Sequence, residues 1–194
     1  MKTVHENYIR IADYALKSAR ANIVRSRTSK GYKKNLARMR WHNFALWSFT
    51  SNPEVILEPD VHPGNCWPFS SDQSQILVKL TEKFQPAAVT LHHIAMAIPR
   101  LAEISSAPKD FAIYGLNEEA EENGTFLGQF TYNSEGEPVQ IFPLEVKKTD
   151  TFQYIRLKVL SNWGNPDYTC IYRFRVHREL PHEAMQRQRV ENNV

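Results

Sequence analysis

The stretch Thr169-Cys170-Ile171-Tyr172-Arg173-Phe174-Arg175-Val176-His177 indicates most clearly which fold this chain adopts. Apolar residues occupy every second position from Cys170 onward, and both arginines fall on the intervening positions. Successive side chains of a β-strand point to opposite faces, so the pattern predicts a strand with one apolar face and one face that carries two arginines. The same alternation returns at 154–160, where apolar residues alternate with Arg156 and Lys158.

Outside this stretch, seven short runs are rich in aliphatic, β-branched or aromatic residues. They are 55–57, 76–80, 88–94, 111–116, 125–132, 139–144 and 154–160. Turn-forming residues separate the runs, as in Asn133-Ser134-Glu135-Gly136 and Asn165-Pro166-Asp167. Short strands with such turns are typical of a sandwich, so we predict a mainly β fold, an antiparallel β-sandwich.

The first residues predict a different element. Tyr8, Ile11, Ala15 and Ala19 lie on one face at helical spacing, which indicates a short N-terminal helix with a thin, Ala-rich stripe. Such a stripe suits a small helical bundle or a coiled coil better than a thick core. We therefore divide the chain into an N-terminal helix at a coiled-coil end (1–24), a basic and aromatic segment (25–52), the β-sandwich (53–178) and a polar C-terminal tail (179–194).

Charge is distributed unevenly along the chain. Residues 1–50 hold 11 Lys and Arg against 2 Asp and Glu, whereas 51–194 hold 13 against 19. A basic arm can bind nucleic acid or a membrane surface. No basic block exceeds two residues in a row, so we favour a solvated or partner-neutralised segment and expect no nucleic-acid partner. Trp41 and Trp47 indicate a surface structure that packs on a partner, or else aromatic side chains that cover the domain's own core.

Composition and length indicate one ordinary globular domain with flanking segments. The 194 residues are 42% hydrophobic and 23% charged, which excludes wholesale disorder. No apolar run approaches the roughly 18 residues of a membrane span, and the polar start lacks the apolar core of a signal peptide. We therefore expect neither a membrane span nor a targeting segment in this chain.

Motifs for catalysis are absent from the sequence. There is no phosphate-binding glycine loop, no CxxC and no HExxH. His92 and His93 are neighbours on a predicted strand and point to opposite faces, so the two cannot share a metal ion. Cys66 could pair with His62 or His93 as a nucleophile, but nothing supplies the orienting carboxylate. We predict that the protein is not an enzyme and has no catalytic cofactor.

The loop Asp60-Val61-His62-Pro63-Gly64-Asn65-Cys66-Trp67 is the densest candidate site. Pro59 stiffens its start and Gly64 permits a positive φ, so the loop can point several carbonyls inward, toward a cation. The alternative is a tight connection pinned at Cys66. Cys66 and Cys170 are the two cysteines of the chain; they are either unpaired core residues or a bridge, and composition leaves both open.

Four motifs in this order resemble the SUN-domain family of nuclear-envelope proteins. They are DYALKSA at 13–19, NPEVILEPDVHPGNCW at 52–67, ISSAPKDF at 104–111 and SNWGNPDYTCIYRFRVH at 161–177. The resemblance extends over about 8–178 and is strongest to animal members, including the shorter testis-type proteins.

The resemblance implies a non-catalytic adaptor. It implies a β-sandwich that forms a homotrimer behind a helical coiled coil and binds the lumenal C-terminal tail of a KASH protein. The pair would form the LINC bridge between nucleus and cytoskeleton. In its full-length context the domain would lie in the perinuclear space, carried by a protein of the inner nuclear membrane. From the residues alone, the alternative is a sandwich module that binds carbohydrate or another ligand.

The resemblance also implies a disulfide and a cation site. The bridge cysteines correspond to Cys66 and Cys170. A structural monovalent cation, potassium by family resemblance, would bind to the backbone carbonyls of Val55, Glu58, Asp60, Asn65 and Tyr172.

The partner-binding residues are carried over in the same way. The pocket for the terminal carboxylate of the KASH tail corresponds to His93, Ser106 and Tyr172. The family's lid over the bound tail corresponds to the basic and aromatic segment, with Trp41 and Trp47.

Three further positions carry expectations of their own. Thr28 stands where several family members have a cysteine that bonds covalently to the partner, so that bond is unavailable here. Arg20 stands where the family prefers glycine, which affects the first turn. Asn123-Gly124-Thr125 is a candidate N-glycosylation site in a polar turn, which we expect to be exposed.

Overall fold

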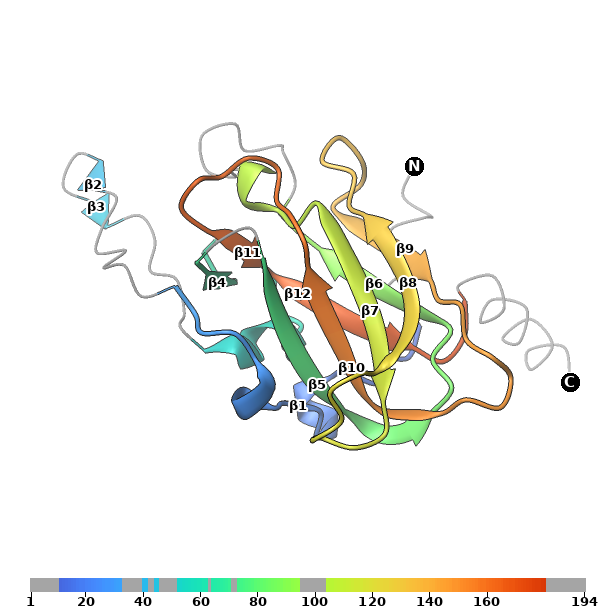
Figure 1. Cartoon of the computed structure of the whole chain (residues 1–194). Coiled ribbons are helices and arrows are strands. Elements are labelled where there is room, and N and C mark those ends of the chain that lie inside the picture. The colour runs from blue at the N-terminus through green and yellow to red at the C-terminus, as the bar shows by residue number, and fades with distance from the viewer. Residues whose placement is uncertain are drawn as a thin grey trace, which may run out of the picture.

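Two antiparallel sheets face each other in the computed structural model of the chain (Figure 1). The residues that the structure describes are 11–32, 40–41, 44–45, 52–62, 64–70, 73–94 and 104–180. The larger sheet has the order β1-β5-β10-β7-β8, with β1 Asn22–Ile23, β5 Ser74–Phe84, β10 Phe152–Val159, β7 Asp110–Leu116 and β8 Thr125–Thr131. The predicted antiparallel β-sandwich is confirmed.

The second sheet has three strands in the order β12-β6-β9. Their bounds are Arg173–His177 for β12, Ala88–His92 for β6 and Val139–Pro143 for β9. Two short pairs complete the strands: β4 Trp67–Phe69 with β11 Thr169–Ile171, and β2 Arg40–Trp41 with β3 Phe44–Ala45. The last pair is a small antiparallel pairing inside the basic and aromatic segment.

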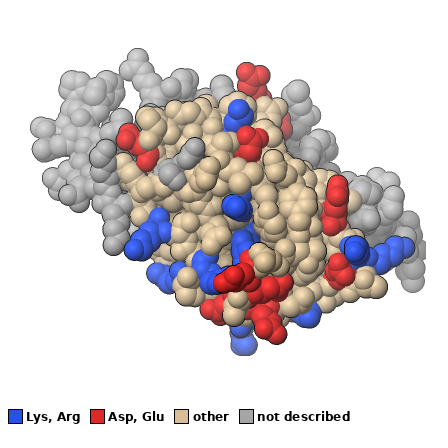
Figure 2. Space-filling model, in the orientation of Figure 1, with Lys and Arg blue, Asp and Glu red and all other residues tan. Residues whose placement is uncertain are grey.

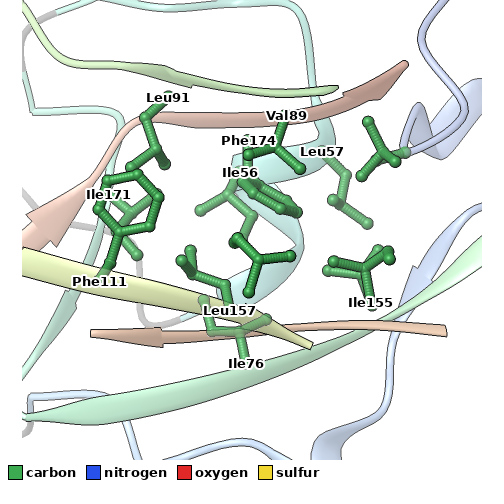
Figure 3. Packing of buried hydrophobic residues seen from close by; sticks show 14 of the residues in the cluster. Ile56, Leu57, Ile76, Val89, Leu91, Phe111, Ile155, Leu157, Ile171 and Phe174 are labelled. Atoms are coloured by element: carbon green, nitrogen blue, oxygen red, sulfur yellow. The ribbon is translucent and has the colours of Figure 1, made fainter. Parts of the chain in front are cut away.

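The core lies between the two main sheets, as the alternation predicts. Ile155 and Leu157 of β10 are fully buried there, while Lys158 is exposed. Figure 3 shows Val89, Leu91 and Phe174 from the smaller sheet interdigitating with side chains of the larger one. Tight packing of this kind makes each lost methylene costly, so the sandwich is a rigid support for whatever its ends carry.

The predicted N-terminal helix is wrong for the described residues, which begin at Ile11. Residues 11–16, here called the N-terminal strap, run across the sandwich, followed by a single 3-10 turn, η1 (Lys17–Ala19). The Tyr14 amide donates to the Val176 carbonyl (2.9 Å), and the Tyr14 carbonyl accepts from the Thr81 amide (3.1 Å). The backbone of Tyr14 therefore joins β12 of one sheet to β5 of the other, and these bonds replace the i→i−4 bonds of a helix.

A left-handed residue follows the strap. Arg20 has a φ of 73°, the one positive value at a non-glycine residue among those described. This is the position at which the family resemblance favours glycine. A residue with a Cβ is strained there, typically by about 1 kcal/mol.

The predicted strand at 55–57 is also wrong. Pro53–Leu57 forms a 3-10 helix, η3, and the Asn52 side chain caps it by accepting from the Glu54 amide (3.2 Å). Proline at the first helical position presets φ and lacks an N–H that a strand would use, so this local chemistry overrides the apolar run. A further 3-10 turn, η2, is Arg25–Arg27.

Candidate functional site

Tyr172 and His93 lie side by side at the end of the smaller sheet. Tyr172 links β11 to β12, and His93 directly follows β6. Arg173 pairs with His92 across these two strands, so the residues beside them are neighbours too. The two ring centroids are 4.9 Å apart, with an interplanar angle of 79°. Residues 79 positions apart are thus brought together by strand register alone.

The His93 ring is buried without a polar partner among the described residues. Its exposed fraction is 2%, and neither ring nitrogen makes a hydrogen bond of normal geometry to that part of the chain, although the Ile94 backbone lies close enough to act on the pKa of the ring. Burial lowers the pKa of His93 to about 4, with the Ile94 backbone opposing this shift and the charge of His92 adding to it. A neutral imidazole offers one N–H donor and one acceptor, so this site has hydrogen-bonding capacity to give to a ligand.

Tyr132 lies on another side of His93, with the ring centroids 6.4 Å apart. Its hydroxyl donates to the Pro138 carbonyl (2.9 Å), and burial raises the pKa of Tyr132 to about 12. The His93 amide donates to the same carbonyl (3.0 Å). Tyr132 therefore supports the ring of His93 and is itself satisfied. The sequence had not pointed to Tyr132, because only the fold brings it there.

The Tyr172 hydroxyl is the second polar group of the site that could donate a hydrogen bond to a ligand. It accepts one long hydrogen bond, from the Gly64 amide at 3.4 Å. Burial raises the pKa of Tyr172, and the Gly64 amide opposes that shift. The phenol therefore stays protonated at neutral pH and retains its O–H for donation. Gly64 has a φ of 86°, the left-handed conformation that the sequence predicted for this loop.

Ser106 lies on an element next to the one that leads into Tyr172. It is buried at the end of a 3-10 turn, η4 (Ile104–Ser106), which packs against β11. β11 ends at the residue before Tyr172. The structure thus brings His93 and Tyr172 into contact and places Ser106 on the neighbouring element.

A hollow opens next to His93. Its volume is about 310 Å³, and its lining includes Ile94, Ile104, Tyr132 and Pro138 together with the turn that joins β8 to β9. The lining combines apolar side chains with the polar side chains of that turn. This combination of a concave wall and a few buried polar groups is what ligand sites share.

A disulfide joins Cys66 to Cys170, as the resemblance implied, with the Cα atoms 5.8 Å apart. Both cysteines are buried, and they form one cluster with Tyr172, against which Val61 packs. The bridge therefore ties the loop 58–66 to β11, which ends at the residue before Tyr172. An oxidised Cys66 cannot act as a nucleophile, which removes the Cys–His hypothesis.

The carbonyls expected to bind a cation belong to Val55 in η3, to Glu58, Asp60 and Asn65 in this loop, and to Tyr172. The Val55 carbonyl accepts from the Glu58 amide (3.0 Å), and the Asp60 carbonyl accepts from the Asn65 side chain (2.8 Å). A carbonyl oxygen has two lone pairs, so each keeps one for an ion. The described residues hold no cluster of three or more His, Cys, Asp or Glu for a metal. Carbonyl oxygens of this kind are ligands for a hard cation and not for a soft transition metal, and the potassium site stays a prediction.

The remaining predicted positions are described in part. Trp41 belongs to β2, of which only the backbone is described, and Trp47 lies outside the described residues. The Thr28 hydroxyl donates to the Val24 carbonyl (2.8 Å) and accepts from the Leu77 amide (3.2 Å). Asn123 is exposed in the turn before β8.

Sequence reasoning missed a buried ion pair behind the site. Arg173 has an exposed fraction of 1%, and its guanidinium binds the Asp13 carboxylate and the Ile56 carbonyl, the latter at 2.9 Å. Burial lowers the pKa of Arg173 to about 10, with Asp13 opposing this shift, so the side chain stays charged at neutral pH. The pair anchors the N-terminal strap to the strand that begins beside Tyr172. Asp13 and Arg173 are 160 residues apart, and no local pattern signals their contact.

Among the described residues, no helix has the length and apolar character needed to span a bilayer.

Comparison with known proteins gives a consistent result. The Sad1/UNC-like C-terminal family matches residues 46–179. SUN domain-containing protein 3 of Bos taurus is 46% identical over 177 residues, which are 91% of this chain and 49% of the relative. SUN domain-containing protein 5 of Homo sapiens is 41% identical over 189 residues, 94% of this chain and 49% of the relative. SUN domain-containing protein 2 of Mus musculus is 46% identical, but the match covers 24% of that relative. The chain thus spans between about a quarter and a half of these relatives.

Solved structures share the fold at low sequence identity. A family 32 carbohydrate-binding module of Streptococcus pneumoniae EndoD has a TM-score of 0.59 and 15% identity, covering 87% of this chain and 100% of the module. Allantoicase from Saccharomyces cerevisiae has a TM-score of 0.57 and 12% identity, covering 86% of this chain and 42% of the enzyme. Since a binding module and an enzyme share this sandwich, the fold alone does not indicate a function.

Proposed function

Since the chain belongs to the Sad1/UNC-like C-terminal family, that of the SUN-domain proteins, we propose that it is a peptide-binding adaptor and not an enzyme. In this proposal it binds the lumenal C-terminal tail of a KASH protein, and the pair forms a LINC bridge from nuclear envelope to cytoskeleton. It acts as a homotrimer in the perinuclear space, carried by a protein of the inner nuclear membrane, and it binds no nucleic acid.

One observation carries this proposal: the buried His93 ring, which has no polar partner among the described residues and lies against Tyr172. A buried polar group without a partner costs about 1–3 kcal/mol, and a sequence keeps it when a ligand supplies the partner. A terminal carboxylate is such a partner, because its two oxygens accept from an imidazole N–H and a phenol O–H at once.

Surrounding elements hold the two donors in place. The disulfide fixes the loop 58–66 against the Tyr172 strand, and Gly64 directs its amide toward the Tyr172 hydroxyl. A potassium ion on the loop carbonyls would stiffen the same loop when bound. Such prior ordering raises affinity, because less conformational freedom is lost on binding.

Non-covalent forces alone hold the proposed complex. By the family resemblance Thr28 stands at the position of a bonding cysteine, and its hydroxyl is hydrogen-bonded to the Val24 carbonyl and the Leu77 amide. The Thr28→Cys variant would restore a covalent bond to a partner tail that carries a cysteine at the facing position. A wild-type complex that ran as a covalent species on a non-reducing denaturing gel would contradict this part.

Titration with a KASH C-terminal peptide tests the binding proposal. We expect Tyr172→Phe, or Ser106→Ala, to weaken binding at least about ten-fold, since each charge-assisted bond contributes about 1.5–3 kcal/mol. The control is Tyr154→Phe, which removes a hydroxyl from a buried tyrosine of β10 outside the pocket. Equal affinity for wild type and Tyr172→Phe would reject the proposed pocket.

Light scattering with and without the same peptide tests the trimer, since it reports mass and binding together. A mass near three chains and three peptides supports the proposal, whereas a monomer that binds one peptide contradicts the trimer alone. The alternative, a carbohydrate-binding module, is less supported, because the likeness to such modules is one of fold at 15% identity. A glycan array separates the two: bound sugar with no bound peptide would favour the alternative.

A further inference from the structure

Strand β8 is an edge of the larger sheet, and its sequence has few features that prevent pairing with other chains. Its sequence, TFLGQFT at Thr125–Thr131, has no charged residue and no proline. Edge strands normally carry such residues, because an open, uncharged edge pairs with other chains and aggregates. The protein does protect the middle of this strand: the register shifts at Leu127, whose carbonyl accepts from the Glu145 amide (2.9 Å). The start of β8 is left open.

The start of β8 also exposes an aromatic side chain. Phe126 is 53% exposed, and it is the one large hydrophobic residue in that state among those described. Its ring meets Tyr114 of β7 edge-on, with the centroids 5.6 Å apart. An exposed Phe126 ring against the half-buried Tyr114 ring forms an apolar patch at this open edge.

The loop before β8 carries a candidate N-glycosylation site, and a glycan on it could cover this patch. Asn123-Gly124-Thr125 is the one N-x-Ser/Thr sequence in the whole chain, and both its asparagine and its threonine are exposed. The middle position has to be glycine: a Cβ on Gly124 would lie 2.9 Å from the Gly115 carbonyl oxygen. The sequon is therefore held in a close turn that leaves its two reactive side chains facing water.

Buried and half-buried arginines fix this loop from below. Arg156 donates to the carbonyls of Glu121 (2.9 Å) and Glu122 (2.7 Å), and Arg27 donates to the Glu121 carbonyl (3.0 Å). The carboxylates of Glu121 and Glu122 remain at the surface. Figure 2 shows acidic side chains gathered at the lower edge of the molecule, where the β7–β8 loop lies in Figure 1. The turn that carries Asn123 is thus polar and anchored, three residues from Phe126.

We propose that Asn123 is N-glycosylated and that the first sugar of the glycan covers Phe126 and Tyr114, shielding the open start of β8. The amide Nδ2 of Asn123 attacks C1 of the first N-acetylglucosamine of a lipid-diphosphate-linked oligosaccharide. The N–C1 bond forms, the C1–O bond to the diphosphate breaks, the amide loses one proton, and the lipid diphosphate leaves. The modification is separate from peptide binding, but it rests on the lumenal setting proposed above, since the donor lipid serves the lumen.

The first test asks whether the site is competent, independently of where the protein resides. The chain is fused to a cleavable secretion signal, expressed in animal cells and treated with peptide-N-glycosidase. We expect one glycan, seen as a single mobility shift in wild type and in Thr125→Ser, and lost in Asn123→Gln and Thr125→Ala. An unshifted wild-type protein would overturn the proposal and would leave the peptide-binding pocket untouched.

The second test addresses the cover over Phe126. Glycoprotein of the high-mannose type is trimmed by endoglycosidase to a single N-acetylglucosamine and compared with Asn123→Gln by thermal unfolding. We expect the sugar to raise Tm by about 2–4 °C in wild type, and to give no increment in the Phe126→Ala background. Equal increments in both backgrounds would show that the sugar does not contact Phe126 and would overturn that part.

The natural protein then tests the setting. Protein taken from its own cells, in its full-length form, should shift on treatment with the same glycosidase. A signal-fused chain that shifts beside a natural protein that does not would show that Asn123 is unmodified in its natural setting. That result would overturn the glycosylation proposal and leave the proposed adaptor role unaffected.

Discussion

Buried polar groups lie on both sides of the segment 172–177, and they differ in whether they are hydrogen-bonded within the chain. On the strap side, Arg173 binds Asp13 and the Ile56 carbonyl, and His177 is bonded through both ring nitrogens, to Thr90 and to the strap. On the pocket side, His93 has no polar partner among the described residues.

Burial alone therefore does not distinguish a structural group from a binding group. His177 and His93 are equally hidden, and burial lowers the pKa of both. The two sides differ in their hydrogen bonds. On the strap side Arg173 and His177 each make two bonds within the chain, although the Nε of Arg173 makes none, whereas on the pocket side neither ring nitrogen of His93 makes one. We infer that the strap side stabilises the fold and the pocket side binds a partner, and each prediction below tests one side.

The largest effect is expected on the strap side, at Asp13. Asp13→Ala leaves the Arg173 charge buried without its counter-ion, so we expect a loss of about 3–5 kcal/mol in the free energy of unfolding, measured in urea. The double variant Asp13→Ala with Arg173→Met should recover most of that loss, because no charge remains buried.

A matched pair at the surface serves as the control. Arg178 and Glu82 are bonded at 2.6 Å, but both side chains are about half exposed. Glu82→Ala should therefore cost less than about 1 kcal/mol. Similar losses for Asp13→Ala and Glu82→Ala would mean that the strap pair is not a structural anchor.

The disulfide is expected to affect both stability and the pocket. It closes a loop over a sequence separation of 104 residues, so replacing both Cys66 and Cys170 by serine should lower stability by about 2–5 kcal/mol. Peptide affinity should also fall at temperatures where the variant is folded, because the loop beside Tyr172 loosens. Asp13→Ala, studied at the same residual stability, should keep its affinity. Oxidised protein in which mass spectrometry finds both thiols free would contradict this prediction.

The pH dependence of stability reports on His93. Its pKa falls from an ordinary 6.5 to about 4 in the folded protein, so between these values the unfolded chain binds a proton that the folded chain does not. Stability should therefore rise with pH across this window and level off above it, by about 3 kcal/mol in all.

His93→Phe separates this contribution from that of His177, whose lowered pKa acts in the same direction. We expect the variant to be at least as stable as wild type at pH 5 and to show a shallower slope in urea unfolding measured from pH 4 to 7. An unchanged slope would mean that the titration belongs to His177 on the strap side.

The smallest effect is expected at Arg20, where the strap leads into β1. Glycine accepts a φ of 73° at no steric cost, so Arg20→Gly should stabilise the protein by about 0.5–1 kcal/mol, or about 2–4 °C in Tm. Arg20→Ala keeps a Cβ and serves as the control. Equal Tm values for the two variants would show that the left-handed turn carries no strain.

The sandwich could be predicted because its signal is local. Alternation of period two at 154–160 and 169–177 follows directly from strand geometry, and the structure buries the expected apolar residues. The helix at the N-terminus was predicted from an equally local pattern and was wrong. Ala15 is buried as that pattern suggests, but Asp13 and Tyr14 make their bonds to strands far along the sequence.

The candidate site could not be derived from spacing at all. His93 and Tyr172 were predicted as binding residues only from the family resemblance. Tyr132 and Asp13 were not predicted at all. Their contacts join residues from 39 to 160 positions apart, and such contacts depend on strand register and on the strap. A sequence pattern reports which face a residue lies on, but the pairing of buried polar groups is a property of the assembled fold.

The most direct test of the central claim is calorimetry with three versions of one KASH C-terminal peptide: the free acid, its carboxamide, and the free acid extended by one residue. If His93 and Tyr172 donate hydrogen bonds to a terminal carboxylate, the carboxamide and the extended peptide should bind wild type at least about ten-fold more weakly than the free acid. The difference between free acid and carboxamide should shrink in His93→Phe and persist in Glu82→Ala. A carboxamide that bound wild type as tightly as the free acid would contradict the claim.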